Sequence, residues 1–348
     1  MSKLKRLNAW RRAILIALTR PVGRSNSKKQ LPPIDPQAVT SVLICRPNHR
    51  LGNQLLTTPL VQEVLATFPH ATIDFFVKGG VVPILYTNYD RIGRFIALPK
   101  KHFKQLPTYL GAWISLRNKR YDLVINVVST SSSGRLSTKM ARATYKVFGD
   151  NDDAIAGLYP DFQHIAKRPV YRLRHALAQW GVPERPTPVP CLNINLGKDE
   201  RAEGKQKLDA LVKDPSAKTI SLYTFATGAK CYDQSWWLPF LEALRTNFPA
   251  YNFLEILPVE NVSSIDFKEP SLYSKDIREM AAIMANTSVL ITADCGVMHL
   301  ASAAQVPIVA LFSVTHPDTY GPYNPPSVSL RTEGLQVEEI LNAVRNMC

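Results

Sequence analysis

The sequence predicts an α/β protein with two doubly wound, Rossmann-like domains, and three observations support this. Short apolar runs alternate with helical patterns along most of the chain. The 348 residues, of which 45% are hydrophobic and 20% charged, are enough for two cores. Proline-rich segments at 30–37 and 181–190 interrupt the alternation. We therefore expect a tail and linker over 1–36, a first domain over 37–185 and a second domain over 186–348.

Each predicted domain contains its own run of strands and helices. In the first, apolar runs predict strands at 41–45, 71–77, 92–98, 122–128 and 144–147, and helical patterns occupy 54–68, 106–118, 135–143 and 171–180. In the second, strands are expected at 218–224, 251–257, 287–292 and 307–312, and helices at 199–212, 235–247, 275–285, 296–304 and 337–346. In such folds ligands bind at the carboxyl ends of the strands, here in a cleft between the domains.

The basic charge of the chain is concentrated at its start. The formal net charge is +14, and residues 1–30 contain nine Lys or Arg and no acid, which leaves +5 for the other 318 residues. Because these cations are confined to the tail, have a single aromatic residue, Trp10, among them and belong to no known module, a nucleic-acid partner is disfavoured.

The tail also has an apolar face. Leu7, Trp10, Ile14 and Leu18 recur at helical spacing, which is typical of an interfacial helix lying on an anionic membrane leaflet. A solvated basic helix is the alternative. The apolar run 13–18 is too short to span a bilayer, and no A-x-A cleavage site follows it. We expect a cytoplasmic protein that is peripheral on the inner face of the inner membrane, attached through residues 1–30.

Neither a disulfide framework nor a metal site is expected. The five cysteines are odd in number and form no C-x-x-C pair, which favours a reducing compartment. The acidic run "GDNDD" at 149–153 has nothing near it in the sequence that completes an oxygen cage, so we interpret it as a solvated cap or turn. No metal and no cofactor are therefore predicted.

The stretch 42–60, "VLICRPNHRLGNQLLTTPL", places a polar loop between a buried strand and a helix expected to begin at Gln54. Gly52 and Asn53 end this loop, and Asn53 is thus predicted to be the last residue before the helix. His49 lies in the same loop, and its imidazole titrates in the range that suits a general base.

The stretch 289–325 contains a candidate diphosphate site. A strand ends at Thr292, Asp294 stands at the expected helix N-cap, and Gly296 permits close approach of a ligand to the backbone. The amides at the start of that helix and its dipole favour an anion. His299 is expected to pack under this loop.

Two further loops follow strands of the second domain. Lys230 follows the strand 218–224 and is expected to face the cleft, although a lone lysine is more often a solvated surface residue. Glu260 follows the strand 251–257. Glu255 is the competing carboxylate, but inside the strand it is expected to be structural.

These motifs resemble those of glycosyltransferase family 9, the ADP-heptose:lipopolysaccharide heptosyltransferases. The match includes the D-x-G-x-x-H segment that begins at Asp294, an amino-terminal motif read here as R-L-G-N followed by T-T-P, and the stretch "YTFATGAKCYDQSWWLPFLEAL" with Lys230 and Trp237. The resemblance covers residues 40–325 and departs from the family at Asn53, where the family has an acid.

The resemblance implies a GT-B fold and inverting, metal-independent transfer of a sugar. The donor it implies is a nucleotide-diphosphate sugar, ADP-heptose, bound by the second domain (186–348). The acceptor it implies is a lipopolysaccharide core or lipid A, on the side of the first domain (37–185). The catalytic residues it implies are Asn53, His49 and Lys230, and the nucleotide-sugar-binding residues are Gly52, Thr227, Lys230, Glu260, Asp294, Cys295, Gly296, Val297 and His299. Because an amide cannot act as a base, the alternative is a non-catalytic, nucleotide-sugar-binding scaffold of envelope polysaccharide assembly.

Overall fold

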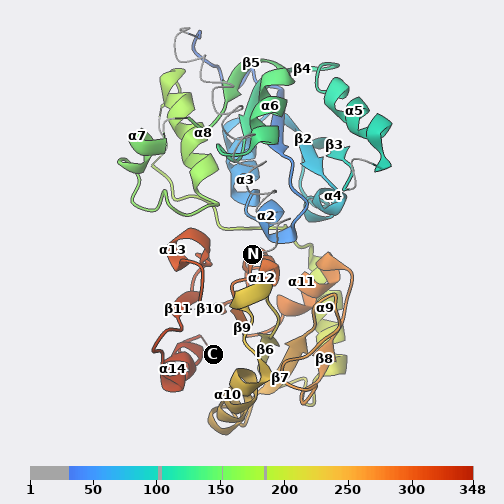
Figure 1. Cartoon of the computed structure of the whole chain (residues 1–348), viewed down its shortest axis with the longest axis vertical. Helices are drawn as coiled ribbons and strands as arrows, with labels where there is room; N and C mark the ends of the chain where they lie inside the picture. The colour runs from blue at the N-terminus through green and yellow to red at the C-terminus, as the bar shows by residue number, and fades with distance from the viewer. Residues whose placement is uncertain (1–30, 101–103, 151, 184–185, 348) are drawn as a thin grey trace, which may run out of the picture. The chain divides into compact units, whose positions relative to one another are not determined.

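The computed structural model describes residues 31–100, 104–150, 152–183 and 186–347. The tail over 1–30, with its predicted amphipathic helix, lies outside these residues. The chain divides into two compact units (Figure 1). The first contains the described residues up to His49 together with Pro59–Pro83 and Asp90–Pro190, and the second contains Arg50–Thr58, Ile84–Tyr89 and Cys191–Cys348.

The first unit is built on a parallel sheet of order β3-β2-β1-β4-β5. Its elements are β1 (Ser41–Arg46), α3 (Thr58–Thr67), β2 (Thr72–Lys78), α4 (Val81–Leu85), β3 (Ile92–Leu98), α5 (Leu106–Ser115), β4 (Arg120–Asn126), α6 (Ser132–Met140), β5 (Arg142–Val147), α7 (Asp152–Ala156) and α8 (Arg168–Gln179). Val42, Leu43 and Ile44 of the central β1 are fully buried, as expected for a parallel sheet that is covered on both faces.

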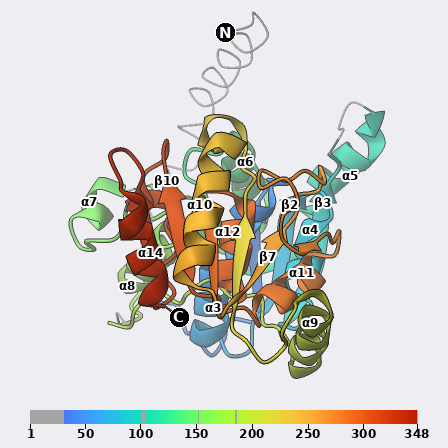
Figure 2. The same cartoon turned by 90° about the horizontal axis from the view of Figure 1, so that it is seen from below.

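The second unit is built on a parallel sheet of order β11-β10-β9-β6-β7-β8. Its elements are α2 (Leu51–Leu55), α9 (Lys198–Leu211), β6 (Thr219–Tyr223), the 3-10 turn η3 (Gly228–Lys230), α10 (Gln234–Asn247), β7 (Asn252–Ile256), β8 (Ser271–Leu272), α11 (Ile277–Met284), β9 (Val289–Ala293), α12 (Gly296–Ala303), β10 (Ile308–Phe312), α13 (Pro317–Tyr320), β11 (Val328–Arg331) and α14 (Val337–Arg345). Figure 2 views these helices and strands from below. The strand order reverses between β6 and β9, which is the topological switch point where doubly wound sheets bind ligands.

The core of the second unit lies between this sheet and the helices α10 and α14. Trp237 and Leu241 of α10 are fully buried against Ile220 and Leu222 of β6 and against Ile340 of α14. This packing fixes the sheet, and therefore also the positions of the loops at its carboxyl edge.

The α/β, two-domain fold is confirmed, and every long strand and helix predicted from the described sequence has a counterpart. The elements that were not predicted, namely α4, α7, η3, β8, α13 and β11, have two to five residues. Such short segments carry too few residues to show a period.

The prediction of a single helix over 54–68 is wrong. The structure has two helices, α2 and α3, that are separated at Leu56 and Thr57. Pro59 has no N–H to donate to the Leu55 carbonyl, so one continuous helix would lose a backbone bond there. The Thr58 hydroxyl donates to that carbonyl instead, at 2.8 Å.

Candidate functional site

Lys230 and Asp294 meet at the switch point of the second sheet. Lys230 is the last residue of η3, the first element after β6, and Asp294 is the first residue after β9. Because β6 and β9 pair in parallel, the loops that follow them lie at the same edge of the sheet. Lys230 Nζ lies 3.0 Å from Asp294 Oδ2. The lysine side chain is 28% exposed and the aspartate side chain 6%, so a buried carboxylate holds a cation that solvent or a ligand can reach.

A third strand end completes this cluster. Thr315 follows β10, and its hydroxyl donates to Asp294 Oδ2 at 2.5 Å. The sequence analysis did not identify Thr315. The signal that could have found it is its place, since it follows the strand next to β9 and its side chain carries a hydroxyl.

Asp294 is not the N-cap of α12, which corrects the expectation from the sequence. The N-cap is Cys295, whose sulfur accepts from the Met298 amide at 3.4 Å. The Asp294 amide still donates to the Leu311 carbonyl of β10, so Asp294 continues the ladder of the sheet, and its carboxylate is held by Lys230 and Thr315. Burial raises the pKa of the Cys295 thiol, which keeps it protonated near neutral pH.

The helices α2 and α12 approach each other at Gly52. A Cβ atom built there would lie 2.9 Å from His299 Cδ2 and 3.3 Å from Gly296 Cα. His299 is 6% exposed, and burial lowers its pKa to about 4 against the raising effect of Asp294. The imidazole is therefore neutral at pH 7, and α12 presents it to α2.

Asn53 lies inside α2, so it is not the last residue before a helix. The helix begins at Leu51, and the Asn53 carbonyl accepts from the Thr57 hydroxyl at 3.3 Å. The apolar period used to predict the helix begins at Gln54, and α2, with five residues, is too short to show a period of its own. His49 follows β1 in the first unit and is exposed.

The two candidate glutamates have different surroundings. Glu260 is exposed on the loop after β7. Glu255 is fully buried in β7 and accepts from the hydroxyls of Thr224 at 2.8 Å and Ser263 at 2.6 Å. Burial raises the pKa of Glu255. Thr227, the residue before η3, is exposed.

The acidic run at 149–153 belongs to the first unit, and its carboxylates pair with arginines. Arg135 Nη1 lies 2.9 Å from Asp150 Oδ1, and Arg172 Nη2 lies 2.7 Å from Asp152 Oδ2. Both arginine side chains are 5% exposed, so these acids anchor buried cations of their own unit.

Comparison with known proteins connects this site to a family. The model of "Glycosyltransferase family 9 (heptosyltransferase)" matches residues 271–340, a segment that includes Asp294, Thr315 and all of α12. Lipopolysaccharide heptosyltransferase 3 of Escherichia coli K12 is 24% identical over 288 residues, which are 76% of this chain and 80% of the relative.

Solved structures share the fold at low sequence identity. A family 9 glycosyltransferase of Veillonella parvula superposes with a TM-score of 0.70 and 18% identity over 90% of this chain and 98% of that one. The E. coli heptosyltransferase WaaC with ADP gives a TM-score of 0.61 and 16% identity over 88% of this chain and 100% of that one. The family model over residues 271–340 and the curated relative agree with the resemblance of the motifs: they support glycosyltransferase family 9, the heptosyltransferase family, and indicate that this chain is a glycosyltransferase.

Proposed function

We propose that the protein transfers a heptose from ADP-heptose to a lipopolysaccharide core acceptor, with inversion and without a metal. The observation that carries this proposal is the cluster of Lys230, Asp294 and Thr315 at the switch point of the second sheet, beside the start of α12. A leaving diphosphate needs positive charge, and an ammonium together with helix-start amides can supply it. Two solved relatives, the E. coli heptosyltransferase WaaC with ADP and the E. coli ADP-heptose lps heptosyltransferase II, support the choice of donor.

In this proposal the diphosphate binds across η3 and the start of α12. An ammonium has three N–H groups, and while one donates to Asp294 the others can donate to phosphate oxygens. The amides of Gly296 and Val297, next to the Cys295 cap, and the Thr227 hydroxyl would add donors. Glu260, exposed after β7, would accept from the ribose hydroxyls. Gly52 permits the close approach of α2 to α12, and the neutral, buried His299 packs at that contact, near the start of α12.

The reaction would be a single displacement at the anomeric carbon. The acceptor oxygen forms the new glycosidic bond while the bond between the anomeric carbon and the diphosphate oxygen breaks, which inverts the configuration. The electron pair leaves with ADP, whose charge Lys230 stabilises, and the acceptor proton passes to a base.

The base is the open point of this mechanism because Asn53 is an amide. We propose that the His49 imidazole takes the proton from the acceptor hydroxyl and that Asn53 orients the acceptor. The acceptor's own phosphate or a water molecule is the alternative destination of that proton. The competing function, a scaffold that binds a nucleotide sugar without transferring it, is favoured by Asn53 alone. The donor-binding residues fit both functions, so the two are separated by whether ADP is released when donor and acceptor are both present.

Thermal shift with ADP, without divalent metal and with a chelator, tests the donor site. Ligand binding should raise stability by about 2.7 kcal/mol at a hundredfold excess over Kd. Lys230→Met should weaken ADP binding by about tenfold or more, the worth of one charge-assisted hydrogen bond. Because it also leaves Asp294 buried without its cation, the double variant Lys230→Met/Asp294→Asn is the matched control for stability.

Three results would contradict the donor assignment. They are full ADP affinity in Lys230→Met, a shift that disappears with the chelator, and a much larger shift with UDP than with ADP.

Transfer assays on a core-lipid acceptor test the base. If His49 is the base, His49→Ala should lower the rate by about a hundredfold, and adding Asn53→Asp to that variant should restore part of the rate. If the wild type binds ADP-heptose and releases no ADP with any core acceptor, the scaffold function holds instead.

A further inference from the structure

The cations outside the tail are gathered in one part of the first unit. Between Arg91 and Gly149 the sequence contains twelve Lys or Arg and a single acid, Asp122. The net charge of +5 left after the tail is therefore unevenly distributed, because this segment alone carries +11. The segment runs from β3 to β5 and includes α5 and α6.

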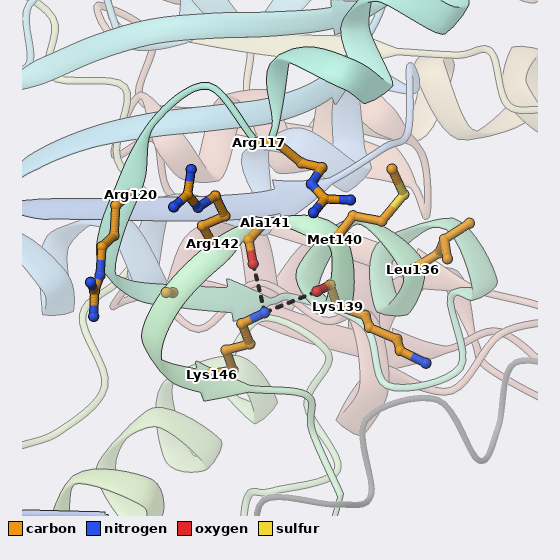
Figure 3. Close-up of a pocket in the computed structure, with 9 residues that line it drawn as sticks. Arg117, Arg120, Leu136, Lys139, Met140, Ala141, Arg142 and Lys146 are labelled. Carbon is orange, nitrogen blue, oxygen red and sulfur yellow. Dashed lines mark hydrogen bonds between the residues drawn. The ribbon is translucent and has the colours of Figure 1, made fainter.

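Several of these cations surround one pocket at the amino ends of β4 and β5. The pocket has a volume of about 610 Å³, and no carboxylate lines it (Figure 3). Its cationic lining residues are Arg117, Arg120, Lys139, Arg142 and Lys146. Within the described part of the chain, none of these five has a carboxylate within salt-bridge distance.

One of the five cations is structural. Lys146 Nζ donates to the carbonyls of Lys139 at 2.9 Å and Ala141 at 2.6 Å, at the end of α6 (Figure 3). Burial lowers the pKa of Lys146. The exposed Arg117, Arg120 and Arg142 are the cations that a large anionic partner can reach.

An exposed apolar stripe lies next to this pocket. Leu106, Leu110 and Ile114 recur at every fourth residue of α5 and are 52%, 51% and 64% exposed. The opposite face of α5 is packed, since Trp113 and Leu116 belong to the core of the first unit. Arg117 lies two residues after the end of α5 and lines the pocket, so the carboxyl end of α5 connects the stripe to the basic pocket. Figures 1 and 2 show α5 at the margin of this unit, beside β3.

We propose that this surface, made of the α5 stripe and the basic pocket, docks on an anionic phospholipid bilayer. Aliphatic side chains on one helix face with arginines beside them match a bilayer interface, where the apolar face enters the headgroup region and the cations meet lipid phosphates. The surface is separate from the donor site, and the inference does not depend on the identity of the sugar.

Charge argues against the other occupants. The tail over 1–30 has nine Lys or Arg and no acid, so it would be repelled by the pocket. A second copy that used the same surface would bring the arginines of two chains together. An acidic protein could match the pocket, but it would leave long aliphatic side chains facing a charged partner.

Vesicle partitioning of the full chain tests this proposal. One variant combines Arg117→Gln, Arg120→Gln and Arg142→Gln, and a second combines Leu110→Ser and Ile114→Ser. Matched controls are Lys198→Gln with Lys213→Gln and Arg331→Gln, which are exposed cations of the second unit, and Leu158→Ser, which is 57% exposed in the first. Vesicles of phosphatidylcholine with phosphatidylglycerol are compared with vesicles of phosphatidylcholine alone.

We expect the arginine variant to lower partitioning onto the mixed vesicles by about tenfold or more, since each cation near an anionic leaflet contributes about fivefold. The leucine–isoleucine variant should lower it severalfold, and both controls should partition like the wild type. The thermal shift with ADP should be the same in all of them, so that failure of docking is distinguishable from failure of the donor assignment.

Four outcomes would overturn the proposal. If the arginine variant and the leucine–isoleucine variant partition like the control variants, the surface takes no part in membrane binding. Binding that does not require phosphatidylglycerol would remove the role of charge. A change of oligomeric state in light scattering, with unchanged partitioning, would assign the surface to a second copy. Stabilisation by inorganic phosphate that the arginine variant abolishes, with unchanged partitioning, would assign the pocket to a free anion.

Discussion

At the scale of single residues, the candidate site depends on how Asp294 and Cys295 divide two tasks. Asp294 is 4% exposed and is held by the Lys230 ammonium and the Thr315 hydroxyl. Cys295 caps α12 through its sulfur, which is a weak acceptor. Asp294 therefore positions the Lys230 ammonium, and Cys295 caps α12. Because the two roles belong to different residues, each can be changed by its own substitution.

Replacing Cys295 by serine should stabilise the protein. A hydroxyl is a stronger acceptor than a thiol for the Met298 amide, and serine is a preferred N-cap, so we expect a gain of about 0.5–1 kcal/mol in the free energy of unfolding. Cys295→Ala removes the cap and should cost about 1 kcal/mol. Urea denaturation measures both. A serine variant less stable than the alanine variant would contradict this account of the cap.

His299 should make stability depend on pH. Its folded-state pKa of about 4 lies below the ordinary value of 6.5 because the ring is buried. The unfolded chain therefore binds more protons between these values, so this stabilisation is fully present above pH 6.5 and is lost as pH falls towards 4.

The loss should be on the order of 2–3 kcal/mol. Unfolding of wild type and His299→Gln across this range measures it, and the glutamine variant should lack this part of the pH dependence. Parallel curves for the two proteins would show that His299 is protonated to the same extent in both states.

At the scale of elements, the packing of α2 on α12 makes Gly52 the sensitive position. The neighbours of an added Cβ would be His299, which is buried, and the backbone of Gly296, so neither can move aside without shifting a helix. Gly52→Ala should cost about 1–3 kcal/mol and weaken ADP binding, because it displaces the start of α12.

Gly157→Ala is the matched control for that substitution. The contacts nearest to an added Cβ at Gly157 are at 3.8 and 4.0 Å, which is ordinary van der Waals distance. Thermal unfolding and ADP titration of the two variants would test the packing. Equal effects at both positions would mean that the close approach at Gly52 has no energetic consequence.

At the scale of the whole molecule, both sheets lie within the described residues, and no described helix is long and apolar enough to cross a membrane. The first strand begins at Ser41, and the Tyr145 hydroxyl donates to the Pro32 carbonyl at 3.1 Å. A chain that begins at residue 31 therefore keeps both sheets and this contact.

Deleting residues 1–30 should leave the melting temperature unchanged and lower affinity for anionic vesicles. Nine cations are lost with that segment, and each contributes about 1 kcal/mol near an anionic surface. Vesicle partitioning at two salt concentrations measures the effect. Equal partitioning of the full-length and shortened chains would refute the role of the tail. Residual binding by the shortened chain that the triple substitution Arg117→Gln, Arg120→Gln and Arg142→Gln removes would show that the docking surface binds independently of the tail.

The sequence determined the alternation of strands and helices, because periodicity is a local property. It also placed Lys230, Asp294 and Glu260 at strand ends, since strand position can be read along the chain. The resemblance to glycosyltransferase family 9 followed from three motifs in order.

Only the tertiary structure decided which groups meet. The partners of Asp294 lie 64 residues before it and 21 after it, a distance along the chain that no local pattern spans. The N-cap of α12 is Cys295, one residue later than predicted, because strand pairing extends through the Asp294 amide. The packing of α2 on α12 also depends on contacts distant in sequence. Periodicity reports which face of an element is buried, but the groups that touch are fixed when the sheet brings its strand ends to one edge.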